Sequence, residues 1–224
     1  MILSLRLQNI ADIVSSDSIV ADIGSDHGLL PISLVVNKRT KKTYAMDIAI
    51  KPLNQAKDNI MKYDVGNSVY PILSDGLENL PDDVNTLVFS GMGSKTIINI
   101  ISKDISKLKN ISEIIMEPNI GSYDIREFMS SLNYSIVFEK TILENDVYYD
   151  IIKCSLGKQE LTTREKLFGP YNLKHIDINF INKWTLIRKK MVSLVRKIPE
   201  SSPQKNKFIE ELSLIDEILK TTID

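Results

Sequence analysis

Asp22-Ile23-Gly24-Ser25-Asp26-His27-Gly28 lies between a short apolar run, residues 18–21, and a longer one, residues 29–36. The first run is short and β-branched, and the second has the apolar spacing of a helix. Strand, glycine turn and helix in this order are typical of a doubly wound α/β sheet, where ligands bind beyond the carboxyl ends of the strands. Gly24 lets the backbone approach a ligand closely. A plain β-α turn without a ligand is the alternative.

The turn differs from the dinucleotide-binding pattern G-x-G-x-x-G, because Asp26 stands where the second glycine would be. A carboxylate at this point repels a pyrophosphate and attracts a cationic sulfonium or ammonium group. The turn therefore favours S-adenosylmethionine (SAM) over NAD. The candidate cofactor contacts from this turn are Asp22, Gly24, Ser25, Asp26 and His27.

Composition and charge limit the class of protein. The chain has 224 residues, of which 43% are hydrophobic and 25% charged, and this suits one large domain with a small appendage. Its net charge of -1 means that a basic surface for nucleic acid must be local. The single Cys154 suits a reducing cytoplasm, and we expect no membrane span and no signal peptide. One cysteine and two histidines predict no metal site.

The rest of the first 157 residues predicts an alternation of strands and helices. After an opening helix at 3–14 and a first strand at 18–23, strands are expected at 43–48, 69–74, 85–90 and 113–117, with helices at 51–63, 96–108 and 123–132. Two further strands, 134–143 and 147–155, are separated by only three residues, so they must pair antiparallel. A seven-stranded mixed sheet of this kind is the architecture of class I SAM-dependent methyltransferases. The fold class expected is therefore Rossmann-like α/β.

The C-terminal part predicts helices only. Apolar residues recur at spacings of four and three, which is a heptad seam, and a Pro/Ser break at 199–203 divides the pattern into two helices. The two seams consist of Phe180, Trp184, Ile187, Met191, Leu194 and Ile198, and of Phe208, Leu212, Ile215 and Leu219. We therefore expect a SAM-binding domain at 1–157, followed by a linker and a coiled-coil arm at 158–224. A monomer is expected, with an arm-mediated dimer as the alternative.

Polar residues follow four of the expected strands at their carboxyl ends. Asp47-Ile48 can bind the ribose hydroxyls of an adenosyl group, with helix capping by Asp47 as the alternative. Asp75-Gly76 can bind an adenine amino group, although Asp-Gly is also a common turn. Gly91-Met92-Gly93 places two small residues where methyl donor and acceptor meet, and Gly91 and Met92 are further candidate cofactor contacts. Glu117-Pro118-Asn119 closes the far side.

At these positions the chain resembles the bacterial tRNA (adenine-N1)-methyltransferases of the TrmK type, which act on adenine 22. The matching segments are Leu3-Ser4, Arg6-Leu7, residues 21–27, residues 75–78, Gly91-Met92-Gly93, Pro118-Asn119, Arg126-Glu127, Gly169-Pro170 and Lys183-Trp184. The resemblance implies SAM as cofactor, tRNA as partner and N1 of adenine 22 as acceptor. Ser94 departs from the pattern, since many relatives have another glycine there.

Methylation of adenine N1 needs alignment and exclusion of water more than a strong base, because N1 has a free lone pair at neutral pH. The candidate residues of the acceptor pocket are Asp26, His27, Glu117 and Asn119, together with the carbonyl of Gly91. Asn119 can read the adenine edge. His27 has the alternative role of fixing the loop. Methylation of the exocyclic N6 is disfavoured, because the Asn/Asp-Pro-Pro-Tyr loop typical of those enzymes is replaced by Gly91-Met92-Gly93.

Basic residues off the first heptad seam predict an RNA-binding face. They are Arg188, Lys189, Lys190, Arg196 and Lys197, and Arg6 and Arg126 are further candidates near the cleft. A solvated coiled-coil face is the alternative. Two other functions stay open at this stage: a SAM-dependent methyltransferase of another RNA, a protein or a small molecule, and a non-catalytic RNA-binding scaffold.

Overall fold

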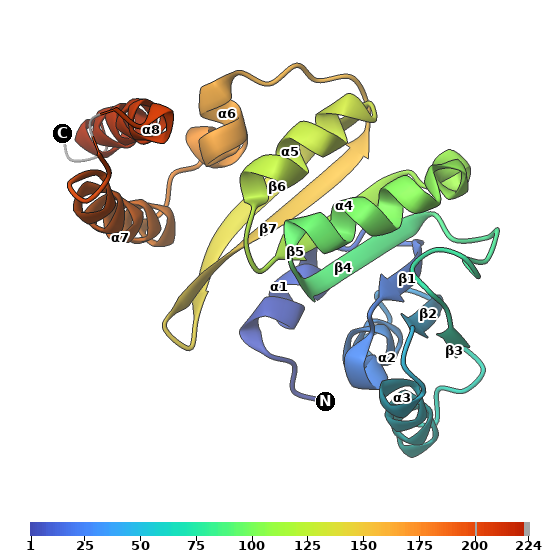
Figure 1. The fold of residues 1–224 in the computed structure, drawn as a ribbon. Helices are drawn as coiled ribbons and strands as arrows, with labels where there is room; N and C mark the ends of the chain where they lie inside the picture. The colour runs from blue at the N-terminus through green and yellow to red at the C-terminus, as the bar shows by residue number, and fades with distance from the viewer. Residues whose placement is uncertain (200, 222–224) are drawn as a thin grey trace.

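A computed structural model describes residues 1–199 and 201–221 (Figure 1). The strands are β1 (Ile19–Ile23), β2 (Lys42–Asp47), β3 (Val69–Leu73), β4 (Thr86–Met92), β5 (Glu113–Pro118), β6 (Tyr134–Glu144) and β7 (Val147–Leu156). The α-helices are α1 (Leu5–Ile13), α2 (Leu29–Val36), α3 (Ile50–Lys62), α4 (Ser94–Lys103), α5 (Ser122–Ser131), α6 (Thr163–Phe168), α7 (Ile178–Val195) and α8 (Pro203–Lys220). The short 3-10 helices are η1 (Asp26–Gly28), η2 (Ile105–Asn110) and η3 (Asn172–Lys174).

The seven strands form one mixed sheet, as predicted. Their order is β3-β2-β1-β4-β5-β7-β6, and β7 runs antiparallel to both β5 and β6. The chain reverses its direction of progress across the sheet between β1 and β4, which are parallel neighbours. This reversal opens a crevice at the carboxyl ends of the two strands. The functional residues expected at strand ends therefore share one edge of the sheet.

Successive side chains of each strand point to opposite faces of the sheet, so apolar residues form a core on each face. On β1, Ala21 and Ile23 pack toward α4 and α5, whereas Val20 packs toward α1 and α2. Figure 1 shows α4 and α5 lying across one face, with α1 and α2 on the other. The sheet is therefore covered by packed helices on both faces.

One predicted helix is shorter than expected. The apolar spacing predicted a helix over residues 96–108, but α4 ends at Lys103 and η2 follows it. Asp104 leaves the helical conformation, with φ of -124° and ψ of 41°, so the two segments are separate. Leu108 still reaches the core from η2.

The two predicted arm helices are present as α7 and α8, which pack together beside α6 (Figure 1). Their core is aromatic at its base, where the ring of Trp184 meets that of Phe168 edge-on at 4.6 Å. Burial of the heptad residues decreases toward the C-terminal end of α7, where Leu194 is 43% exposed. Of the predicted break at 199–203 and the arm's end, Glu200 and residues 222–224 lie outside the described residues. Within the described part of the chain, no helix combines the length and apolarity needed to cross a membrane.

Arg126 joins the arm to the sheet, and the prediction that it binds RNA is wrong. Its side chain is 1% exposed. The guanidinium donates from Nε to Glu139 at 2.6 Å and from Nη1 to the carbonyls of Lys166 and Leu167 at 2.9 Å each. A buried, fully engaged guanidinium cannot reach a phosphate. Arg126 instead ties α5 to β6 and to the last turn of α6.

Candidate active site

The turn after β1 is fixed by its backbone. The N–H groups of Gly24 and Ser25 both donate to the carbonyl of Met46 on β2, at 2.8 and 2.9 Å. Gly24 has φ of +73°, and a Cβ added there would lie 2.2 Å from Cε of Met92. Any side chain at residue 24 would therefore be strained and would also displace Met92. This turn brings the ends of β1 and β4 into contact.

Two buried acids flank the turn. Asp22 lies at the end of β1, and Asp47 lies at the end of β2. Burial raises the pKa of Asp22 to about 7, and the charge of Asp47 acts in the same direction. Asp47 Oδ1 accepts a hydrogen bond from the N–H of Ala49 at 2.8 Å, so the alternative capping role is also present.

Glu117 is completely buried beneath the end of β4. Its Oε2 accepts hydrogen bonds from the N–H of Gly91 at 3.0 Å, Ser90 Oγ at 3.2 Å and Arg6 Nη1 at 3.1 Å. Burial raises the pKa of Glu117, while the neighbouring Arg6 opposes that rise. The side chain of Glu117 is 0% exposed and is not among the residues that line the cavity at this edge. The expectation that it lines the acceptor pocket is therefore corrected, since the carboxylate supports the loop from below.

Asn119 holds the same loop from its other side. Its Nδ2 donates to the carbonyl of Gly91 at 2.7 Å, and its backbone N–H donates to the carbonyl of Met92 at 2.8 Å. A bulge between Ser90 and Met92 turns Gly91 outward, with φ of +72° and no atom within 4 Å of an added Cβ. The exposed side chain of Asn119 stands at this opening. Gly91 and Asn119, both predicted for the acceptor region, are thus in contact.

Asp26 and His27 lie at the outer end of the turn. The His27 ring nitrogen Nε2 is 3.1 Å from Asp26 Oδ1, and both side chains are exposed. The carbonyl of His27 accepts a hydrogen bond from Asn59 Nδ2 at 2.9 Å, which ties the turn to α3. Because the backbone of His27 has φ of +62°, this bond helps to hold an uncommon conformation. The alternative role of His27, fixing the loop, is therefore filled by its backbone carbonyl, whereas its imidazole ring is exposed.

A cavity of about 320 Å³ joins several of these groups. It is lined by Arg6, Leu7, Asp22, Gly24, Asp26, His27, Leu29, Leu30, Ser90, Gly91 and Met92. Arg6 enters it from α1, with Nε 2.9 Å from Glu144 Oε2 and its guanidinium 4.5 Å from the centre of the Tyr149 ring. Arg6 was predicted as an RNA contact, but its charge is already paired within this cavity. The contacts of Glu144 and Tyr149 with Arg6 could not be predicted from the sequence, because these residues lie far from Arg6 along the chain.

The other predicted cofactor contacts lie along the same edge of the sheet, outside this cavity. Ile48 follows Asp47 and is exposed. Asp75 is 2.7 Å from Lys103 Nζ at the surface. A Cβ added to Gly76 would lie 2.8 Å from Ile100, so glycine is required for close packing against α4. The predicted cofactor contacts therefore lie along one edge of the sheet, from the end of β1 through the end of β2 to the loop after β3.

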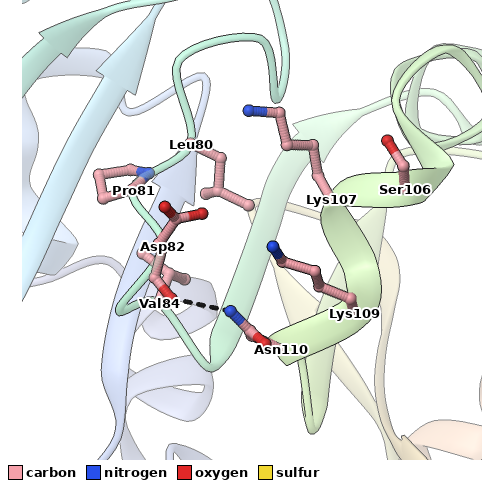
Figure 2. A pocket seen from close by; sticks show the side chains of 8 residues that line it. All are labelled: Leu80, Pro81, Asp82, Val84, Ser106, Lys107, Lys109 and Asn110. Carbon is pink, nitrogen blue, oxygen red and sulfur yellow. Dashed lines mark hydrogen bonds between the residues drawn. The ribbon is translucent and has the colours of Figure 1, made fainter.

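A separate cavity of about 320 Å³ lies at the opposite edge of the sheet (Figure 2). Its lining residues, among them Lys107 and Lys109, precede β4 and β5. Asn110 closes one side by donating to the carbonyl of Asp82 at 3.0 Å. Because it lies at the amino ends of the strands, this cavity is not part of the candidate site.

The predicted basic face is present on the arm. Lys189, Lys190, Arg196 and Lys197 are exposed, while Arg188 is paired with Asp216 of α8. Ser94, the departure from the family pattern, is buried at the start of α4 and donates to Asp124 at 3.3 Å. In the described ranges, no three His, Cys, Asp or Glu side chains are grouped to hold a metal ion.

The geometry fits a SAM cofactor. The turn at Gly24 admits no side chain, and two buried acids stand at the ends of β1 and β2. A cationic group in the cavity would offset the burial that raises the pKa of Asp22.

Comparison with known proteins agrees with this geometry. Residues 3–152 match the family described as a methyltransferase domain. The tRNA (adenine(22)-N(1))-methyltransferase of Bacillus subtilis strain 168 is 28% identical over 231 residues, which cover 99% of this chain and 97% of that protein. Streptococcus pneumoniae Sp1610, solved in complex with S-adenosyl-L-methionine, is 26% identical, with a TM-score of 0.90 over 97% of this chain and 100% of that one.

A second solved relative is M. capricolum TrmK in complex with S-adenosyl-homocysteine. It is 30% identical, and the match has a TM-score of 0.88 over 98% of this chain and 99% of that one. The similarity therefore extends through the arm as well as the sheet. The chain belongs to the methyltransferase domain family and, within it, to the TrmK group.

Proposed function

We propose that this protein transfers the methyl group of SAM to N1 of adenine 22 in tRNA. The observation that carries the proposal is the joined edge of β1 and β4, where the glycine-only turn meets Met92, next to the outward-facing Gly91. The named relatives act on tRNA at this position or hold SAM or its product. A bound SAM supplies a methyl group on a positively charged sulfur.

The cofactor would be held by the turn and the acids beside it. Asp22, Gly24, Ser25, Asp26 and His27 surround the amino-acid end, with the buried carboxylate of Asp22 matching its positive charge. Asp47 and Ile48 take the ribose, and Asp75 and Gly76 take the adenine edge. Met92 closes the cavity over Gly24. We assign this set as the cofactor site.

Acceptor positioning falls to Gly91 and Asn119. Asn119 Nδ2 is engaged by the carbonyl of Gly91, which directs its Oδ1 toward an incoming base as a hydrogen-bond acceptor. The N6 amino group of adenine is a donor, and its N1 is the atom to be methylated, so this pairing selects adenine over guanine. Asp26, exposed at the cavity mouth, stabilises the positive charge that develops on the ring. Glu117 acts as a positioning residue through Gly91.

The arm supplies the RNA contacts in this proposal. Lys189, Lys190, Arg196 and Lys197 face solvent along and just beyond α7, and a tRNA phosphate backbone requires such a local basic surface. The seam of α7 is covered by α8 of the same chain, which supports a monomer. We also propose that the protein works in the cytoplasm, where tRNA is its partner.

Nucleoside mapping tests the proposal directly. Unmodified tRNA transcript is incubated with protein and SAM, digested, and examined by mass spectrometry. We expect 1-methyladenosine at position 22, and no product from a transcript with guanine at that position. Gly24→Ala serves as the matched negative control, because the added methyl group displaces Met92 from the cofactor cavity. Methylation at N6, or in the guanine transcript, would contradict the assignment.

A further inference from the structure

A second cavity lies between the sheet domain and the arm, next to the candidate active site. Its volume is about 330 Å³. The loop after β5, the start of β7, α6 and α7 form its walls, with Asn119, Ile120, Tyr148, Lys183, Trp184 and Ile187 among the lining residues. Asn119 also holds Gly91, so the two sites share one residue. Apart from Asn119, the lining residues named here have no function assigned so far.

The cavity is uncharged overall. At its floor Asp150 is buried and bonded to Ser122 Oγ at 2.7 Å and to Lys183 Nζ. Arg126 lies 3.7 Å from Asp150 and is paired with Glu139, so two cations face two carboxylates. A phosphate or a free carboxylate would find no unpaired positive charge among these groups. The floor therefore favours a neutral ligand.

The walls suit a flat aromatic ring. Tyr148 is half-buried on one side, and Ile120 is 75% exposed on the loop at the entrance. Trp184 is buried behind them. Bases of single-stranded nucleic acid stack on aromatic side chains such as Tyr148 irrespective of sequence. A nucleobase is thus the ligand that both the floor and the walls accept.

This base cannot be the methylated adenine itself. The acceptor ring must meet the cofactor above β4, whereas Tyr148 and Asp150 lie on β7, two strands further across the sheet. Two strand spacings are about 10 Å. A ring in the cavity is therefore out of reach of the methyl group. A neighbouring nucleotide of the same strand can occupy it while the adenine is at the active site.

We propose that this cavity binds the base of a nucleotide adjacent to the methylated adenine, stacked on Tyr148 and closed by Ile120. The proposal rests on the assigned tRNA methylation. Along α7, Lys190 follows Lys183 by seven residues and Ile187 by three, so it shares their face and is exposed. The strand leaving the cavity can therefore pass its phosphate to Lys190.

Steady-state kinetics with tRNA transcripts test this site. We expect Tyr148→Ala to raise the KM for tRNA about tenfold, the loss that one base–aromatic stack produces, with kcat unchanged. Tyr148→Phe keeps the ring and should retain the wild-type KM. Affinity for S-adenosylhomocysteine, measured by calorimetry, should not change in either variant. Tyr70→Ala, at the far edge of the sheet, is the matched control and should behave as wild type.

Transcripts that lack one base on either side of adenine 22 identify the ligand. With wild-type protein, one of the two abasic transcripts should show the same rise in KM, and Tyr148→Ala should add nothing further to it. Independent, multiplying effects for both transcripts, or an unchanged KM for Tyr148→Ala, would overturn the proposal. Wild-type protein that forms no 1-methyladenosine on the intact transcript would instead refute the assigned function.

Discussion

At the residue scale, the peptide groups on both sides of Gly91 are the most constrained part of the site. Glu117 accepts the hydrogen bond of the Gly91 N–H, and Asn119 donates to its carbonyl. Gly91 itself has the left-handed backbone that favours glycine. Donors and acceptors fixed before the substrate arrives need no reorganisation during the reaction. Fixed alignment of this kind suits a reaction that needs no strong base.

Asp22 makes the stability of the ligand-free protein depend on pH. Its pKa rises from an ordinary value of 3.8 to about 7 in the fold, so the folded state binds a proton more tightly than the unfolded state does. The stabilisation is complete below pH 4 and is lost as pH rises toward 7. We expect Asp22→Asn to gain stability relative to wild type between pH 5 and 7.5, by up to about 3 kcal/mol.

Urea unfolding of both proteins at the two pH values measures this difference. The exposed Asp82 provides a matched control, because Asp82→Asn removes an acid without removing a buried charge. The difference in unfolding free energy between that variant and wild type should be the same at pH 5 and at pH 7.5, because both proteins keep Asp22. An equal stability gap for Asp22→Asn at both pH values would show that the buried carboxyl does not titrate in this range.

At the element scale, most of the architecture could be predicted because its signals are local. The turn at 22–28 and the short connection at 144–146 each admit few structures. The turn and the hairpin are both present, but the hairpin connection is only Asn145 and Asp146, because Glu144 still pairs with Val147. The end of α4 was not predictable from apolar spacing, since residues 105–108 keep that spacing although η2 has replaced the helix. Contacts between distant elements were also beyond reach, as with Arg6 and Glu144, which are 138 residues apart.

The position of the strand-end residues at one edge of the sheet could be predicted, because the carboxyl ends of parallel strands meet there. The burial of the charged groups could not be predicted. Arg126 was expected near the cleft as an RNA contact, and Glu117 was expected to line the acceptor pocket. Each is buried beside a partner from another element, Glu139 for Arg126 and Arg6 for Glu117. Sequence spacing carries no information on such pairs. Whether a charge serves a ligand or the fold could be decided only from its neighbours.

Arg126 gives a prediction for the join between α5, β6 and α6. Arg126→Met would leave the carboxylate of Glu139 buried without its cation and two carbonyls of α6 without their donor. Removing one partner of a buried pair costs about 3–5 kcal/mol. Urea unfolding should show a loss of this size. Arg164→Met, an exposed arginine on α6, should change stability by less than about 0.5 kcal/mol, and equal losses for both variants would contradict the buried role.

At the scale of the whole molecule, a protein with a net charge of -1 must bind a polyanion through one part of its surface. The arm packs on the β6 side of the sheet, whereas α3 covers the β2–β3 side (Figure 1). Basic residues on the arm and on α3 therefore lie at opposite edges of the sheet, so their contributions to RNA binding can be measured separately. Both ends carry exposed lysines, Lys189 and Lys190 on α7 and Lys57 and Lys62 on α3.

Salt dependence separates the two ends. Each lysine that contacts a duplex phosphate adds about 0.9 to the slope of log KM against log salt concentration, because it releases counterions. Replacing Lys189 and Lys190 with Gln should raise the KM for tRNA at low salt and lower the slope by about 1.8, with kcat unchanged. Replacing Lys57 and Lys62 with Gln removes the same charge from α3 and should leave both KM and slope as in wild type. If the α3 variant loses as much slope as the arm variant, only net charge matters, and the arm is a solvated helical hairpin rather than the RNA-binding surface.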